Sequence, residues 1–114
     1  MTVTCPASGT HTPSGYTETI LKGINSEGVY SFHVDLSNMQ SGDTVELRIY
    51  QAILSTGTAQ CAYFQSFSGA QESNNLIAVS VPIANELTIS NALKFTIKQT
   101  AGTYRAFYWK VLKY

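Results

Sequence analysis

The sequence predicts an all-β fold, an antiparallel, jelly-roll-like β-sandwich of about seven or eight strands. Short segments rich in β-branched and aromatic residues recur along the chain, with turn residues between them. Apolar and polar residues alternate in several of these segments, and no segment keeps a 3.6-residue apolar period. The 114 residues suit one domain with one core, and no internal repeat divides them.

The first half of the chain contains the clearest strands. Apolar and polar residues alternate strictly from Tyr30 to Leu36, which is the pattern of a strand with one wet face. Turn residues follow in Ser37–Asp43, and Val45–Tyr50 then alternates in the same way. We expect these two strands to be antiparallel neighbours, with an earlier strand at Tyr16–Ile24.

The second half adds further strands with a higher aromatic content. Gln60–Phe67 is extended but has no clear inner face, which indicates a strand covered on both sides. Leu76–Val81 is a short strand, Ile83–Asn91 is a connection, and Leu93–Lys98 alternates again. Tyr104–Leu112 is the last strand and contains the only tryptophan. The predicted core consists of Phe32, Val34, Leu47, Ile49, Phe95, Ile97 and Trp109.

Residues 1–15 are predicted to form an extended N-terminal arm before a single β-sandwich domain of residues 16–114. Thr2–Ser14 contains two prolines, a glycine and many hydroxyl groups, a composition typical of a loop or arm. Such an arm either reaches a neighbouring molecule or lies along its own domain. The start of the chain has neither a basic nor an apolar run, so no signal peptide is expected. Cys5 and Cys61 are expected to be reduced thiols that meet only if the arm folds back.

Composition and charge exclude several classes of function. Apolar residues make up 44% of the chain, charged residues only 12%, and the formal net charge is zero. A surface covered by hydroxyl, amide and tyrosine side chains suits packing against protein and argues against nucleic-acid binding. The longest apolar runs are shorter than the roughly 20 residues of a membrane span.

The charges are distributed unevenly along the chain. Met1–Glu86 carries two basic and seven acidic residues, whereas Leu87–Tyr114 carries five basic residues and no acid. This asymmetry favours charge pairing inside the fold over head-to-tail contact between copies or docking on an acidic partner.

The residues that could carry chemistry form no catalytic pattern. His33 and Asp35 lie on one face of a predicted strand, but a serine on a sharp elbow is missing. The sequence also shows no paired carboxylates, no glycine-rich phosphate loop and no metal-ligand spacing. We therefore expect a protein that is not an enzyme and binds no cofactor or metal. Several tyrosines are free to serve protein contacts or sugar stacking, or to be shared between the two sides of a thin sandwich. These are Tyr50, Tyr63, Tyr104 and Tyr108.

Two stretches carry a resemblance to a known group of proteins. Val34–Tyr50 (VDLSNMQSGDTVELRIY) and Leu93–Tyr114 (LKFTIKQTAGTYRAFYWKVLKY), together with Leu76–Val81, resemble small proteins encoded among the structural genes of tailed bacteriophages. The resemblance implies a virion structural protein, a capsid decoration or cement protein of jelly-roll or β-sandwich type. Such proteins sit as trimers or other oligomers at the symmetry axes of the head and fasten neighbouring capsomers.

The resemblance also implies partners and a location. The chain would bind the outer capsid surface, bridge subunits of the major capsid protein and stabilise the head, as a homo-oligomer with a trimer favoured. It would be assembled in the host bacterial cytoplasm and reside on the capsid surface, without binding nucleic acid or membrane. One alternative is a carbohydrate-binding β-sandwich module that stacks sugars on Tyr104, Tyr108 and Trp109. Another is a head–tail or tail adaptor present in few copies. The expected capsid or oligomer contacts are Thr2, Val3, Thr4, Tyr104, Arg105 and Tyr108.

Overall fold

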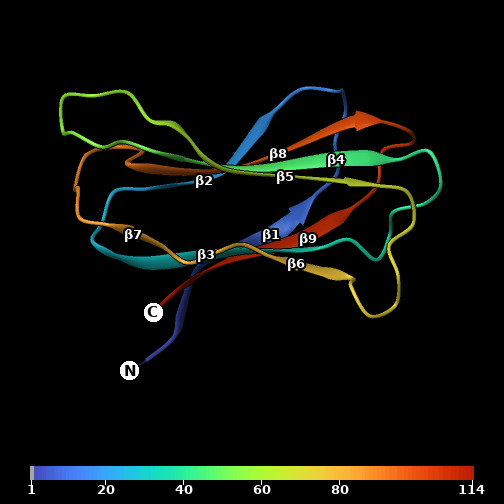
Figure 1. The fold of residues 1–114 in the computed structure, drawn as a ribbon, viewed down its shortest axis with the longest axis horizontal. Helices are drawn as coiled ribbons and strands as arrows, with labels where there is room; N and C mark the ends of the chain where they lie inside the picture. Colours follow the sequence, from blue (N-terminus) through green and yellow to red (C-terminus); the bar gives the residue numbers. More distant parts are fainter. Residues whose placement is uncertain (1) are drawn as a thin grey trace.

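The computed structural model describes residues 2–114, which form nine antiparallel strands in two sheets and no helix. The sheets lie one above the other, and both chain ends lie at the same end of the lower sheet (Figure 1). Sheet A contains β1 (Thr4–His11), β3 (Gly28–Asp35), β6 (Ile77–Val79), β7 (Ile83–Asn85) and β9 (Phe107–Lys113). Sheet B contains β2 (Thr19–Ile24), β4 (Thr44–Gln51), β5 (Gln60–Ser68) and β8 (Leu93–Ala101).

The strand order is that of a jelly roll. Sheet A has the order β1-β9-β3-β6, with β7 also paired to β3, and sheet B has the order β2-β8-β4-β5. Strands that follow each other in the sequence therefore alternate between sheets, except at β4 and β5 and at β6 and β7. This confirms the predicted antiparallel sandwich. Two strands are additional to those placed from the sequence. One is β1, and the other is β7, because the segment expected to be a connection begins with Ile83–Asn85 paired to Gly28–Tyr30.

Two expectations about individual strands are wrong. β3 and β4 are not neighbours, since β3 pairs with β9, β6 and β7, whereas β4 pairs with β5 and β8. Both strands face the same core from opposite sheets, and alternation in a sequence identifies the buried face but not the adjacent strand. β5 is not covered on both sides but is an edge of sheet B, and most of its residues are exposed.

The core lies between the inward faces of the two sheets. Phe32 of sheet A and Phe95 of sheet B meet with ring centroids 5.5 Å apart. Six of the seven predicted core residues are buried, and the seventh, Trp109, is partly buried and packs against the core. The Trp109 indole lies over Gly9 on the neighbouring strand, where a Cβ atom would be 3.4 Å from the ring. Glycine at this position therefore leaves room for the only tryptophan.

The N-terminal segment is an edge strand and not the expected extended arm. Residues Thr4–His11 form β1 and pair with β9, from Thr4 opposite Lys113 to His11 opposite Phe107. The ladder is irregular between Thr4 and Ala7, where Pro6 stands, and edge strands tolerate proline because its missing N–H removes no essential bond. The hydroxyl-bearing residues and prolines of this segment therefore led to the incorrect prediction of an arm in place of a strand.

Cys5 of β1 and Cys61 of β5 are exposed free thiols in different sheets. None of the residues 2–114 belongs to a helix that could cross a membrane.

Candidate functional site

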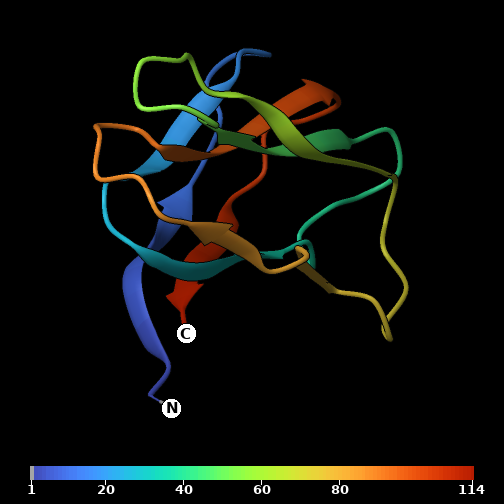
Figure 2. The same ribbon diagram turned by 60° about the vertical axis from the view of Figure 1, so that its left-hand side comes forward.

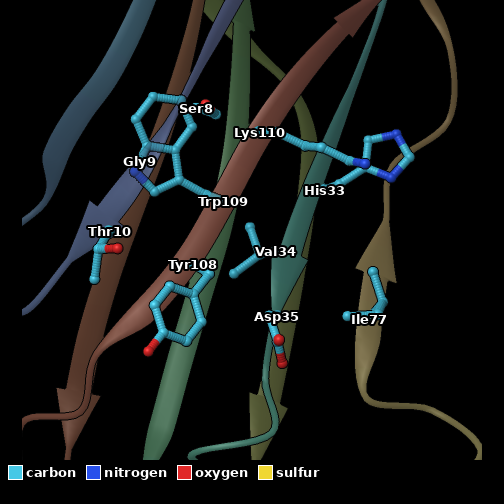
Figure 3. A pocket seen from close by; sticks show the side chains of 10 residues that line it. All are labelled: Ser8, Gly9, Thr10, His33, Val34, Asp35, Ile77, Tyr108, Trp109 and Lys110. Atoms are coloured by element: carbon cyan, nitrogen blue, oxygen red, sulfur yellow. The ribbon is translucent and has the colours of Figure 1, made fainter. Parts of the chain in front are cut away.

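The outward side of sheet A carries a shallow hollow of about 490 Å³. It extends across β1, β9, β3 and β6, so four strands contribute to one surface (Figure 3). We call this surface the sheet A face and define it by the side chains of Ser8, Thr10, His33, Asp35, Ile77, Val79, Tyr108 and Lys110.

The register of the strands brings these residues together in two rows. Ser8 of β1 lies opposite Lys110 of β9, which lies opposite His33 of β3, which in turn lies opposite Val79 of β6. In the adjacent row, Thr10 is paired with Tyr108. Because side chains two positions apart in a strand share a face, both rows project away from the core.

His33 is held by a chain of hydrogen bonds that runs along the outside of β3. Its Nε2 atom is 2.8 Å from the Ser31 hydroxyl, which is 2.7 Å from the hydroxyl of the C-terminal Tyr114. Burial lowers the pKa of His33, and the positive charge of Lys110 opposite lowers this pKa further. The imidazole is therefore neutral at neutral pH and presents an aromatic, uncharged surface to a partner.

The histidine and the aspartate considered for catalysis lie on this face without forming a catalytic arrangement. Oδ1 of Asp35 accepts a hydrogen bond of 2.9 Å from the Ser37 backbone N–H. The hydroxyl group within reach of His33 belongs to Ser31, which is only 1% exposed. Among the described residues, no three or more His, Cys, Asp or Glu side chains are placed to hold a metal ion. Around His33 and Asp35, the described residues provide contacts and hydrogen bonds, and the one hydroxyl that reaches the imidazole is buried.

Exposed apolar side chains lie along the sheet A face. Tyr108, on the central strand β9, is 53% exposed. On β6, Ile77 is 53% exposed and Val79 is 56% exposed. Large apolar groups that gather on a rigid sheet and are rimmed by polar side chains are typical of a contact surface. The sheet A face therefore combines apolar area with polar groups suited to protein recognition.

The six expected contact residues do not converge. Thr4 pairs with Lys113 at the end of β9, and the exposed Thr2 and Val3 precede it. Tyr104 and Arg105 precede Phe107 at the opposite end of β9. A seven-residue strand is about 23 Å long, so the two groups lie far apart. Of the six, Tyr108 alone belongs to the sheet A face.

Two of the expected contacts are engaged inside the fold. Arg105 Nε donates a 2.7 Å hydrogen bond to Asp43 Oδ2. This ion pair joins the acidic part of the chain to the basic part, in line with the charge pairing favoured above. The Tyr104 ring meets the Tyr16 ring edge-on, with centroids 5.4 Å apart. Both residues therefore stabilise the loop that leads into β9.

A second polar cluster lies on the outward side of sheet B. Oε2 of Glu18 accepts hydrogen bonds of 2.7 Å from both the Tyr50 and Thr96 hydroxyls. The hydrogen bond to Glu18, with burial, raises the pKa of Tyr50 to about 12. The Lys94 ammonium lies 5.0 Å from the centroid of the Tyr50 ring. Tyr50 is thus fixed by its neighbours rather than free to stack on a ligand.

Sequence reasoning missed most of the sheet A face. Alternation in β3 and β9 marks the outward positions of both strands, including those of His33 and Lys110. That signal shows which residues leave the core, but it cannot show that β1, β9, β3 and β6 lie side by side. No protein-family model, curated protein or solved structure matches this chain in the three comparisons with known proteins.

Proposed function

We propose that this chain is a bacteriophage virion structural protein, a capsid decoration or cement protein that binds the outer capsid surface through the sheet A face. It bridges subunits of the major capsid protein and thereby stabilises the head. The observation that supports this proposal is the surface on which the exposed apolar side chains of Tyr108, Ile77 and Val79 gather beside His33, with Asp35 and Lys110 as its charged groups. The choice of a capsid as the partner rests on the resemblance of Val34–Tyr50 and Leu93–Tyr114 to phage structural proteins.

A protein of this kind acts by binding to the capsid surface and catalyses no reaction. A standard protein interface buries about 800 Å² on each partner, and aromatic and aliphatic anchors near its centre supply most of the affinity. When several copies are joined as a homo-oligomer, each further contact with the shell forms at a high effective concentration. A modest single contact then becomes durable. Strands that are already hydrogen-bonded into a sheet lose less conformational entropy on binding than a flexible loop would.

Cosedimentation with purified phage capsids tests this proposal. We expect saturable binding, with a number of bound copies per particle that matches the symmetry of the capsid. Ile77→Lys should abolish binding because it places a charge in the apolar part of the sheet A face. Ile20→Lys is the matched control, because Ile20 on sheet B is also 53% exposed and should tolerate the change without loss of binding. Binding that survives Ile77→Lys contradicts the role of this face, and no capsid binding at all contradicts the function.

A carbohydrate-binding module is the second candidate, favoured by the polar side chains beside Tyr108 in the hollow. Tyr104, Tyr108 and Trp109 do not form one stacking platform, since Tyr104 packs on Tyr16 and Trp109 packs against the core. Sugar binding would therefore depend on the Tyr108 ring alone. Retention on glycans that is lost in Tyr108→Ala, without capsid binding, would favour this function. Capsid association at only a few copies per particle would favour a head–tail or tail adaptor.

A further inference from the structure

One long part of the chain is almost free of charge, and the fold gathers it on one side. Between Arg48 and Glu86 the only charged residue is Glu72. This stretch contains β5, which is an edge of sheet B, and β6 and β7, which border sheet A beside β3. Figure 2 shows these strands, coloured from yellow-green to gold, on one side of the sandwich. We call this side the uncharged edge.

β5, the long strand of the uncharged edge, has fewer of the usual protections against pairing than the edge strands β1 and β2. Edge strands are usually protected by charges, proline, irregular register or shortness, because their free N–H and C=O groups would otherwise pair with another strand. β1 has Pro6 and an irregular register, and β2 has Lys22 beside a register shift. β6 and β7 have three residues each. β5 has nine residues, with neither a charge nor a proline, and its one register shift lies near its start, between Cys61 and Tyr63.

Apolar side chains accompany the open edge of β5. Phe64 on β5 is 46% exposed, and Val81, which follows β6, is 59% exposed. A hollow of about 470 Å³ between the two sheets is lined from β5 by Tyr63 and Phe67, and Val81 lines it from the sheet A side. The uncharged edge therefore offers both backbone hydrogen-bonding groups and apolar area.

We propose that a second copy of this chain covers the uncharged edge, with β5 of each copy paired antiparallel across a two-fold axis beside Phe64. An antiparallel strand edge is complementary to itself, because a two-fold rotation places N–H groups opposite C=O groups. A two-fold axis also places each residue near its own equivalent, and an uncharged strand avoids the like-charge repulsion that this would create. The pairing doubles the four-stranded sheet B.

The dimensions of this side suit a stable dimer. A nine-residue strand is about 31 Å long, and two sheets packed about 10 Å apart with their side chains are roughly 20 to 25 Å thick. A face of this size has about 700 Å², close to the roughly 800 Å² per partner of a standard interface. In the proposed register the two Phe64 side chains are cross-strand neighbours and Cys61 lies opposite Phe67. The contact borders the sheet A face, because Ile77 and Val79 of β6 line the hollow between the two sheets as well.

Sedimentation equilibrium of the purified protein tests this contact. We expect a reversible monomer–dimer equilibrium in the wild-type chain, and Ser66→Lys and Val81→Lys should each raise the dimer dissociation constant by about a hundredfold, because each would bury a lysine charge in the uncharged contact. Ser66 lies on sheet B and lines neither hollow, so capsid binding by Ser66→Lys reports separately on the proposed function. Ile20→Lys adds the same charge to the opposite edge strand of sheet B and should leave the equilibrium unchanged. Circular dichroism shows that each variant is folded.

Cysteine cross-linking tests the register. In a chain that carries Cys5→Ser and Cys61→Ser, oxidation of Phe64→Cys should trap a covalent dimer, because Cα atoms of opposite antiparallel residues lie about 4.5 to 5.5 Å apart, within disulfide range. Cys61 of the wild-type chain should trap none, since two copies of it lie about 20 Å apart in this register. A monomer at all concentrations overturns the proposal. A trimer or dimer that withstands both Ser66→Lys and Val81→Lys also overturns it.

Discussion

The Arg105 guanidinium and the Asp43 carboxylate form a 2.7 Å ion pair, in which the carboxylate side chain is 1% exposed and the guanidinium side chain 28% exposed. The same carboxylate accepts the backbone N–H groups of Gln40 and Thr103. One aspartate thus fastens the turn before β4 to the loop between β8 and β9. A Cβ atom at Gly102, whose φ is +89°, would collide with Asp43, so glycine is required for this close approach.

Removal of the Asp43–Arg105 pair should destabilise the fold. Breaking a buried ion pair costs about 3–5 kcal/mol, and the partial exposure of Arg105 reduces this, so we expect Arg105→Ala to lower the free energy of unfolding by about 2 kcal/mol. Asp43→Ala should cost about 3 kcal/mol, since it also leaves two partly buried N–H groups without their acceptor. Urea denaturation measures both. Lys22→Ala is the control, with an expected change within about 0.5 kcal/mol, and equal effects of all three variants would contradict the role of the pair.

The stability of the protein should fall at acidic pH because of the same carboxylate. Burial raises the pKa of Asp43, but hydrogen bonds from Arg105, Gln40 and Thr103 outweigh this effect and lower the pKa below its ordinary value. A lowered folded-state pKa contributes stability above the unfolded value of about 4, and this stability is lost as the pH falls through the folded value. We therefore expect the stability difference between wild type and Asp43→Asn to shrink below about pH 4. Urea titrations between neutral and strongly acidic pH measure it, and a constant difference would refute this prediction.

Tyr50 should resist ionisation at alkaline pH. The hydrogen bond to Glu18 and burial raise its pKa to about 12, and the neutral hydroxyl stabilises the fold. This contribution is complete below the unfolded value of about 10 and is lost as the pH rises through about 12. Glu18→Gln should lower the pKa of Tyr50, as measured by tyrosine absorbance against Tyr50→Phe. Glu72→Gln, on an exposed loop, should leave the titration unchanged, and the same curve for Glu18→Gln would argue against the hydrogen bond.

His33 should titrate below the ordinary range of histidine. Burial and the Lys110 ammonium lower its pKa, so Lys110→Met should raise the pKa by removing the charge opposite. The lowered pKa means that stability is present above the ordinary value of about 6.5 and declines as the pH falls through the folded value. NMR titration of the imidazole measures the shift. His11, whose pKa is lowered by burial alone, provides an internal control that should not respond. An unchanged His33 midpoint in Lys110→Met would show that the two groups do not interact.

Residue alternation along the chain predicted the fold class and most of the core. Alternation at Phe32 and Val34, and again at Phe95 and Ile97, identified inward positions correctly, because a period of two places every second side chain on the buried face. It failed at Thr4–His11, where an edge strand made of hydroxyl, proline and glycine residues has no apolar face to bury and therefore lacks the pattern. The exposed β5 gave a misleading signal for a related reason, since its aromatic residues project on both sides of the edge.

Which strands are neighbours, and therefore which residues form the two proposed contact surfaces, became visible in the three-dimensional fold alone. Lys110 and His33 are 77 positions apart in the sequence but lie opposite each other in paired strands. Arg105 was expected to face a partner, and the loop geometry instead turns it toward the buried Asp43. Side-chain periodicity is a local property of one strand, whereas register and strand order depend on contacts between distant segments. The alternation of residues within one strand therefore predicts which side chains are buried. The packing of the two sheets determines which exposed side chains lie next to each other.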